Sequence, residues 1–144
     1  MRTVQDVEAY LEKLNRRYSV VEGERNTYLI HTSEAFPPIA MRIDPPLVVL
    51  RVHIADASAD QPALFRKLLQ LNAGSLLHSS YGLESARQTA SGEGTSSVST
   101  DRIVLGSALE LENLDFNELE ATLDEIDVAL AQQVPELSQL LKRS

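Results

Sequence analysis

The chain has 144 residues, of which 43% are hydrophobic and 24% are charged, a composition typical of one globular domain. It contains no cysteine, which excludes disulfides, thiolate metal sites and cysteine nucleophiles and fits a reducing cytoplasm. A formal net charge of -8 and a pI near 4.8 argue against nucleic acid or anionic membrane as a partner, because both would be repelled. We therefore expect a cytoplasmic protein with a single domain over residues 1–144.

The first expected element is a helix over residues 4–15. Thr3 and Asp6 have the spacing of a capping pair, and apolar residues then recur at helical spacing. Its apolar stripe is narrow, so we expect it to pack on a sheet or on a second helix. The segment is amphipathic and carries acidic residues, which argues against a signal peptide.

Four apolar runs follow, separated by turn-forming residues, and each predicts a short strand. They cover residues 18–21, 28–30, 39–43 and 47–54. The last run alternates most clearly, and we expect one of its faces to carry Val48, Leu50, Val52 and Ile54. Because the turns between the runs are short, the strands must pair as antiparallel hairpins.

A second helix is predicted from Pro62 to about Ala73. Asp60 is expected to cap its start, and Gly74 is expected to end it in the left-handed conformation. Apolar residues point almost all round this helix, although a helix on the surface needs only one apolar stripe. Some of these residues must therefore be covered by another part of the chain or by a partner.

Two further strands centre on residues 81–83 and 103–105. The segment between them, residues 87–100, is polar and rich in small residues, so we expect a flexible hairpin tip there. The complete element order is thus α-ββββ-α-ββ-α. It predicts an α+β fold.

The third helix is predicted to start at Asp115, which stands three residues before Glu118 as a capping pair. Apolar residues repeat at intervals of three and four over residues 116–130, and acidic residues occupy the opposite face. Pro135 predicts a kink or a new helical turn near the end of the chain.

No catalytic, cofactor-binding or metal-binding motif emerges from the sequence. His31, His53 and His78 lie on separate elements, and none has a second ligand at metal-binding spacing. The SGEGTSS stretch lacks the spacing and the lysine of a phosphate-binding loop, and no GxSxG elbow occurs. We therefore name no catalytic residue, no cofactor and no metal, and expect a protein that is not an enzyme.

Two stretches of the chain, LLQLNAGSLLHSSYGLE and RIVLGSALELENLDFNELEATLDEIDVAL, resemble the type III secretion chaperone-like families. These bacterial families include the Tir-chaperone group and the YbjN-type sensory-transduction-regulator-like proteins. The similar features are a leucine-rich helix that ends in residues 71–73, strands at residues 81–83 and 103–105, and an acidic last helix. Membership would imply a strongly bent antiparallel sheet with helices packed on it.

The resemblance also implies a small acidic homodimer whose interface is built from the second helix and a neighbouring strand. The expected dimer-interface residues are Leu64, Phe65, Leu68 and Leu71. Each apolar side chain of this size contributes roughly 1.5–3 kcal/mol when fully buried, which would offset moderate association costs. The alternative is a helix buried wholly within one chain by the first or third helix.

Chaperones of this kind hold an extended segment of a partner protein, and such segments can add to exposed strand edges. The expected partner-binding residues are Leu11, Val20, Val21, Tyr28 and Ile30. Their alternative role is the ordinary core of the sheet. The polar insertion at residues 87–100 is longer than the turn usual in dedicated secretion chaperones.

Three functional hypotheses follow. The first is a non-enzymatic, chaperone-like homodimer that holds a segment of a partner protein. The second is a regulatory interaction module of the YbjN type that binds a folded partner and has no secretion role. The third is a small enzyme whose catalytic residues converge only in three dimensions.

Overall fold

The computed structural model describes residues 2–33, 35–58, 60–86 and 100–142, and these form three helices and six strands. The helices are α1 (Val4–Lys13), α2 (Pro62–Gly74) and α3 (Phe116–Lys142). The strands are β1 (Tyr18–Val20), β2 (Thr27–Ile30), β3 (Ile39–Asp44), β4 (Leu47–Ser58), β5 (Ser80–Ala86) and β6 (Thr100–Glu110). This α+β class and this element order are the predicted ones.

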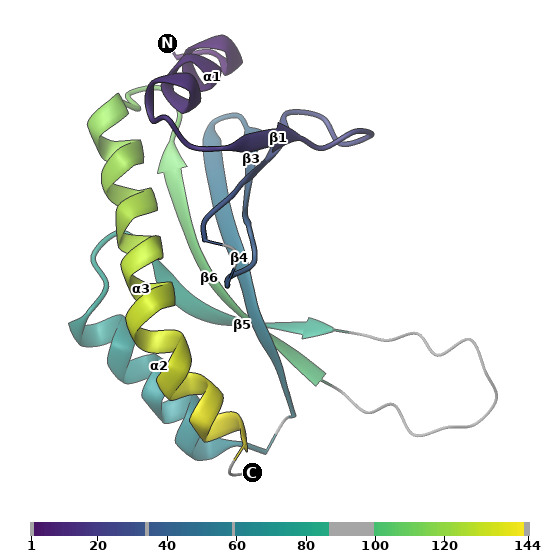
Figure 1. The fold of residues 1–144 in the computed structure, drawn as a ribbon, viewed down its shortest axis with the longest axis vertical. Helices are drawn as coiled ribbons and strands as arrows, with labels where there is room; N and C mark the ends of the chain where they lie inside the picture. Colours follow the sequence, from purple (N-terminus) through teal and green to yellow (C-terminus); the bar gives the residue numbers. More distant parts are fainter. Residues whose placement is uncertain (1, 34, 59, 87–99, 143–144) are drawn as a thin grey trace, which may run out of the picture.

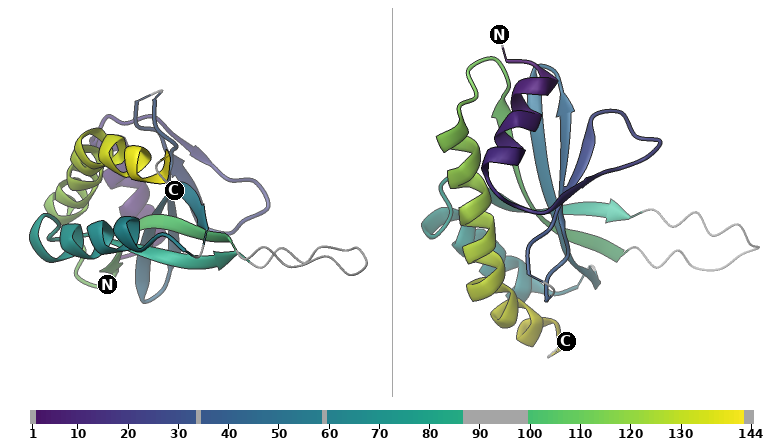
Figure 2. Two further views of the ribbon diagram at one scale, coloured as in Figure 1. Left: turned by 90° about the horizontal axis from the view of Figure 1, so that it is seen from below. Right: turned by 45° about the horizontal axis from the view of Figure 1, so that its top comes forward.

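All six strands belong to one antiparallel sheet with the order β1-β2-β3-β4-β6-β5. The hairpin of β5 and β6 joins the first four strands through the pairing of β6 with β4, so β1 and β5 form the two edges of the sheet. Figure 1 shows that β4 and β6 curve along their length, which bends the sheet as predicted. The helices lie on one side of it (Figure 2).

The core lies between the helices and one face of the sheet. Residues alternate between buried and accessible along β3 and β4, so only one face of each strand is covered. On that face Met41 lies opposite Leu50 and Val52 opposite Leu105, and all four side chains are fully buried. The helices complete this core with buried residues of all three, among them Leu11, Leu64 and Leu123.

The capping pair at the start of α1 is confirmed. The Thr3 hydroxyl accepts a hydrogen bond from the amide of Asp6, and the Asp6 carboxylate accepts one from the amide of Thr3. The helix is shorter than predicted because Asn15 has a φ of 57°, the left-handed conformation that ends a helix.

Strand β4 is longer than predicted and reaches Ser58, because it pairs with β6 along its whole length. A register shift lies between His53 and Ala55. Val48, Leu50 and Val52 are buried as expected, but Ile54 sits at the shift and is only half-buried. The alternation resumes beyond the shift at Ala57, which is buried.

Both predicted end signals of α2 are wrong. Gln61, not Asp60, occupies the N-cap position and makes no capping hydrogen bond with its side chain, and Pro62 begins the helix. Gly74 is the last helical residue and has no positive φ; Ser75 follows as the C-cap in the right-handed region, its amide bonded to the carbonyl of Leu71. The helix therefore stops without a left-handed residue.

Helix α3 begins where the sequence predicts, with the Asp115 carboxylate accepting the amide of Glu118 at 2.7 Å. It continues through Pro135 to Lys142 as one helix. The predicted hairpin tip at residues 87–100 lies outside the described residues, apart from Thr100, which opens β6.

Candidate functional site

An apolar hollow opens between helix α2 and the edge strand β5, with a volume of about 290 Å³. We call it the α2–β5 hollow. Its lining residues are Phe65, Leu68, Leu69, Asn72, Tyr81, Gly82 and Leu83. Leu69 is 70% exposed and Leu83 is 45% exposed, so the rim of the hollow presents apolar side chains to water. Apolar surface of this kind is typical of a contact site.

A polar frame holds the two walls of the hollow together. The side-chain oxygen of Asn72 accepts a hydrogen bond from the backbone amide of Tyr81 at 2.7 Å, and its side-chain nitrogen donates one to the backbone carbonyl of Tyr81 at 3.0 Å. The Tyr81 hydroxyl donates to the Gln133 side chain on α3 at 2.6 Å. Burial raises the pKa of Tyr81 to about 12, which keeps the phenol neutral and able to donate.

A second polar anchor, Glu125 of α3, fixes the segment between α2 and β5. Its carboxylate accepts the amides of Leu77 and His78, at 2.6 and 2.8 Å, and the hydroxyl of Ser79 at 2.7 Å. Burial alone would raise the pKa of Glu125, but these hydrogen bonds outweigh it and lower the pKa. The anchored segment presents Leu77 almost entirely to water, since this residue is 90% exposed.

The four residues predicted for a dimer interface divide into two groups. Leu64, Leu68 and Leu71 are 1%, 4% and 8% exposed, because the chain's own sheet and α3 already cover them. Phe65 is half-buried, and both Phe65 and Leu68 line the hollow. Sequence reasoning did not select Leu69 and Leu83, although both carry the exposed apolar surface of the rim.

At the opposite edge of the sheet, two backbone hydrogen bonds bracket the pairing of β1 with β2. The amide of Val21 donates to the carbonyl of Thr27 at 3.0 Å, and the amide of His31 donates to the carbonyl of Arg17 at 2.8 Å. Arg17 and Val21 therefore turn their backbone groups toward β2. Backbone groups alternate in direction along an antiparallel strand, so this fixes the direction of every residue between them.

The residues between this pair of hydrogen bonds are Tyr18, Ser19 and Val20. Ser19 faces β2, opposite Leu29, while the backbone groups of Tyr18 and Val20 point to the outer side. Strand β1 ends the sheet, so no strand of the described sheet pairs with that side. The edge therefore offers the backbone donors and acceptors of two residues to an added strand.

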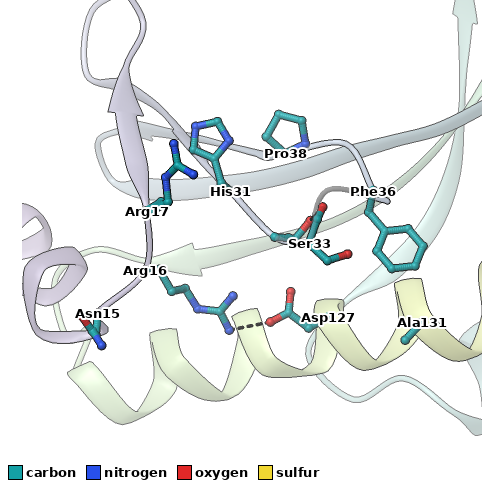
Figure 3. Close-up of a pocket in the computed structure, with 10 residues that line it drawn as sticks. Asn15, Arg16, Arg17, His31, Ser33, Phe36, Pro38, Asp127 and Ala131 are labelled. Atoms are coloured by element: carbon teal, nitrogen blue, oxygen red, sulfur yellow. Dashed lines mark hydrogen bonds and ion pairs between the residues drawn. The ribbon is translucent and has the colours of Figure 1, made fainter.

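A larger hollow with a volume of about 780 Å³ lies where β1 begins, and we call it the β1-end pocket (Figure 3). Its walls come from the α1–β1 turn, the segment after β2 and helix α3. The lining residues are Asn15, Arg16, Arg17, His31, Thr32, Ser33, Phe36, Pro38, Asp127 and Ala131.

Two adjacent arginines of this pocket differ in their surroundings. Arg16 contacts Asp124 at 2.9 Å and Asp127 at 2.7 Å, and its side chain is 17% exposed. Burial would lower the pKa of Arg16, but the two carboxylates raise it, so the guanidinium stays charged. Arg17 is exposed and makes no ion pair within the part of the chain that the structure describes.

The five residues predicted to bind a partner also divide. Leu11, Tyr28 and Ile30 are at most 3% exposed and belong to the core of the single chain, so their side chains are not accessible at its surface. Val20 is 63% exposed and Val21 is half-exposed, both at the β1 edge. Contact of a partner with these two valines stays a prediction.

Tyr18 and Tyr28 connect the β1 edge to α1 through hydrogen bonds. The Tyr28 hydroxyl donates to Glu8, and the Tyr18 hydroxyl donates to Glu12, both at 2.5 Å. Burial and the Glu8 carboxylate raise the pKa of Tyr28 to about 12. These bonds place α1 firmly over the first two strands.

Within the described ranges, no group of three or more His, Cys, Asp or Glu residues is arranged to hold a metal ion. His53 contacts Asp56 at 2.9 Å at an exposed place on β4, His31 lines the β1-end pocket, and His78 lies beside Glu125. None of the described helices is long and apolar enough to cross a membrane.

The comparisons with known proteins agree on the fold. Residues 1–143 match the family model CesT_Tir_1. A chain of the heterodimeric ExoU–SpcU complex, from the type III secretion system of Pseudomonas aeruginosa, is 18% identical with a TM-score of 0.60; the match covers 96% of this chain and 99% of that chain. YbjN from E. coli is 11% identical with a TM-score of 0.54, covering 92% and 97%. No curated protein matches the sequence.

Proposed function

Because the chain belongs to the CesT_Tir_1 family of type III secretion chaperones, we propose that it is a non-enzymatic, chaperone-like homodimer that holds a segment of a partner protein. The observation that carries this proposal is the open apolar hollow between α2 and β5. It is the kind of surface that a protein contact covers, since left in water it favours aggregation.

For the dimer, we propose that the α2–β5 hollow of one subunit packs on that of the other. A two-fold contact is self-complementary, so the same helix and strand can meet their own copies. Phe65, Leu69 and Leu83 would make the contact, and Leu68 would form the floor. Leu64 and Leu71, predicted as interface residues, would support this surface from within the subunit.

For the segment of the partner, we propose the β1 edge. Tyr18 and Val20 point backbone groups outward, and the exposed side chain of Val20 offers an apolar contact beside them. An extended segment that adds here gains backbone hydrogen bonds, and its alternate side chains can enter nearby pockets. The similar ExoU–SpcU fold occurs in a heterodimeric complex, which supports protein binding by this architecture.

Photocrosslinking tests the segment site. A benzophenone amino acid is placed at Val20, and at Leu47 as the control, because Leu47 is an exposed apolar residue on the interior strand β4. In cells of the source organism, the Val20 position should crosslink to one protein through a short region, and the Leu47 position should not. Equal crosslinking from both positions would contradict the site.

The likeness to YbjN favours one alternative, a regulatory module that binds a folded partner. Limited proteolysis of the crosslinked product separates the two functions. An extended segment is cleaved on both sides of the crosslink in the partner's own sequence, whereas a folded partner resists cleavage as a compact domain.

A further inference from the structure

We infer that the β1-end pocket selects partner segments that carry an acidic side chain, and that Arg17 is the residue that pairs with it. This inference rests on the proposed binding of a segment at the β1 edge and adds the chemistry of that segment. It is drawn from the unequal surroundings of the two arginines in the pocket.

The charge of Arg16 is already neutralised within the chain. Its guanidinium bridges Asp124 and Asp127, and Figure 3 shows it directed at α3 beneath the pocket. Arg17, the next residue, is directed to the other side of the pocket and has no carboxylate partner among the described residues. Among the described residues, the positive charge of Arg17 is therefore left without an ion pair beside the pocket, in a chain whose net charge is -8.

Other donors lie around the same place. His31 is directly across from Arg17, since its amide donates to the Arg17 carbonyl at 2.8 Å, and Figure 3 shows the two side chains next to each other. A neutral imidazole donates one N–H, and the hydroxyl of Ser33 in the same wall can donate another hydrogen bond. Together with a guanidinium, these groups suit a carboxylate.

The pocket also continues the proposed segment site. Arg17 immediately precedes Tyr18, the first residue of β1 with outward backbone groups. A strand that pairs with Tyr18 must therefore pass beside Arg17. Phe36 and Pro38 provide an apolar wall in the same pocket, so an apolar residue close to the acidic one would also be accommodated.

The charges around the pocket limit the charge of the anion that it can bind. Asp124 and Asp127 carry two negative charges against the single positive charge of Arg16, and Arg17 brings the sum of these four groups to zero. The guanidinium of Arg17 is thus the one charge of this group that has no ion pair among the described residues. This matches a single carboxylate and disfavours a doubly charged phosphate. Salt screens charges beyond a Debye length of about 8 Å, so the acidic surface elsewhere weakens this pairing only moderately.

Selection from a random peptide library tests the inference. A phage-displayed library of dodecapeptides is selected on the immobilised protein, on Arg17→Gln and on Arg66→Gln. Arg66 is the matched control, an exposed arginine of α2 that makes no ion pair among the described residues. The unmodified protein and Arg66→Gln should enrich Asp or Glu at one position, and Arg17→Gln should lose that enrichment.

A selected peptide then gives the magnitude, measured by fluorescence anisotropy with blocked peptide termini. Replacing its acidic residue by the amide should weaken binding by about three- to tenfold on the unmodified protein, the range for a partly exposed charged pair. On Arg17→Gln the two peptides should bind equally. On Arg17→Glu a lysine at the same peptide position should be preferred.

The possible outcomes separate the inference from the proposed function. Peptides selected without an acidic preference, or with one that persists in Arg17→Gln, would overturn the role of Arg17 and leave segment binding intact. Failure to select any peptide would overturn both. Circular dichroism of each variant confirms that the fold is retained, as expected for an exposed side chain.

Discussion

The two edges of the sheet present different surfaces. At the β5 edge, α2 and β5 enclose an apolar hollow, and Leu69 and Leu83 are exposed on its rim. At the β1 edge, the strand is only three residues long, and the accessible groups are mainly backbone amides and carbonyls and the charges of the β1-end pocket, with Val20 as a single exposed apolar side chain.

This difference bears on how long each contact would last. Burial of apolar area is the main favourable term in stable association, so the β5 edge suits a permanent subunit contact. Backbone hydrogen bonds and exposed ion pairs exchange readily with water and contribute little net free energy each. The β1 edge therefore suits a partner that is held and released.

The largest expected effect is at the apolar edge. Leu69→Asp removes one exposed leucine from each subunit of the proposed dimer and places a charge in the contact. At roughly 1.5–3 kcal/mol for each buried leucine, the dimer should weaken by about 3–6 kcal/mol, or two to four orders of magnitude in Kd. Sedimentation velocity measures the mass.

The control for this substitution is Val128→Asp, because Val128 is a similarly accessible apolar residue on α3, 52% exposed. It should leave the mass unchanged. If the unmodified protein is monomeric at high micromolar concentration, the homodimer is ruled out, and so is the role of the β5 edge as a subunit contact.

The next effect concerns the frame that holds the β5 edge in place. Glu125→Ala removes the acceptor of three hydrogen bonds and should lower the free energy of unfolding by about 1.5–3 kcal/mol. Urea denaturation measures it. Glu120→Ala on the same helix is the control and should change stability by less than about 0.5 kcal/mol. An equal fall in the free energy of unfolding of both variants would show that the three hydrogen bonds of Glu125 do not account for the loss.

The Glu125 effect should depend on pH. Its pKa is lowered in the folded chain, so the unfolded chain binds this proton more tightly. The stabilisation is complete above the pKa of the unfolded chain and is lost as the pH falls through the folded value. The difference between the unmodified protein and Glu125→Ala should therefore shrink below about pH 4.

A smaller loss of stability is expected at the β1 edge from Arg16→Gln. The substitution removes the positive charge that pairs with the Asp127 carboxylate. One oxygen of this carboxylate is already buried and has no hydrogen-bond partner among the described residues. Because the side chains of Asp124 and Asp127 are both partly exposed, the free energy of unfolding should fall by about 1–2 kcal/mol. Thermal unfolding followed by circular dichroism measures it, and an unchanged midpoint would contradict the bridging role.

The smallest effect is expected from the neighbouring residue. Arg17→Gln should change the free energy of unfolding by less than about 0.5 kcal/mol, because its exposed side chain has no partner within the described chain. The same unfolding measurement on both arginine variants separates a structural arginine from one available for binding. A loss for Arg17→Gln as large as that for Arg16→Gln would remove the distinction.

The sequence predicted the elements well because their signals are local. Capping by Thr3 and Asp6, alternation from Val48 to Val52 and the spacing of apolar residues in α3 all operate over a few residues. Where the prediction failed, longer-range pairing or backbone conformation decided. Strand β4 extends to Ser58 because β6 pairs with it, and α2 ends without a left-handed Gly74.

The candidate sites were predicted less completely. The second helix and the first strands were the right regions, but within them the sequence selected mostly residues that the core takes, such as Leu64, Leu11 and Ile30. An apolar residue reads the same in the sequence whether its own chain or a partner covers it. Leu69 was passed over, although its exposure makes it the better candidate for a contact.

The sequence by itself determined the fold class, the element order and the family, since hydrophobic spacing and turn residues are written along the chain. Only the tertiary structure decided which strands form the edges, which face of α2 stays open and which of two adjacent arginines is already paired. Those features depend on side chains far apart in sequence, such as Arg16 and Asp127, and the packing of the whole chain brings them together.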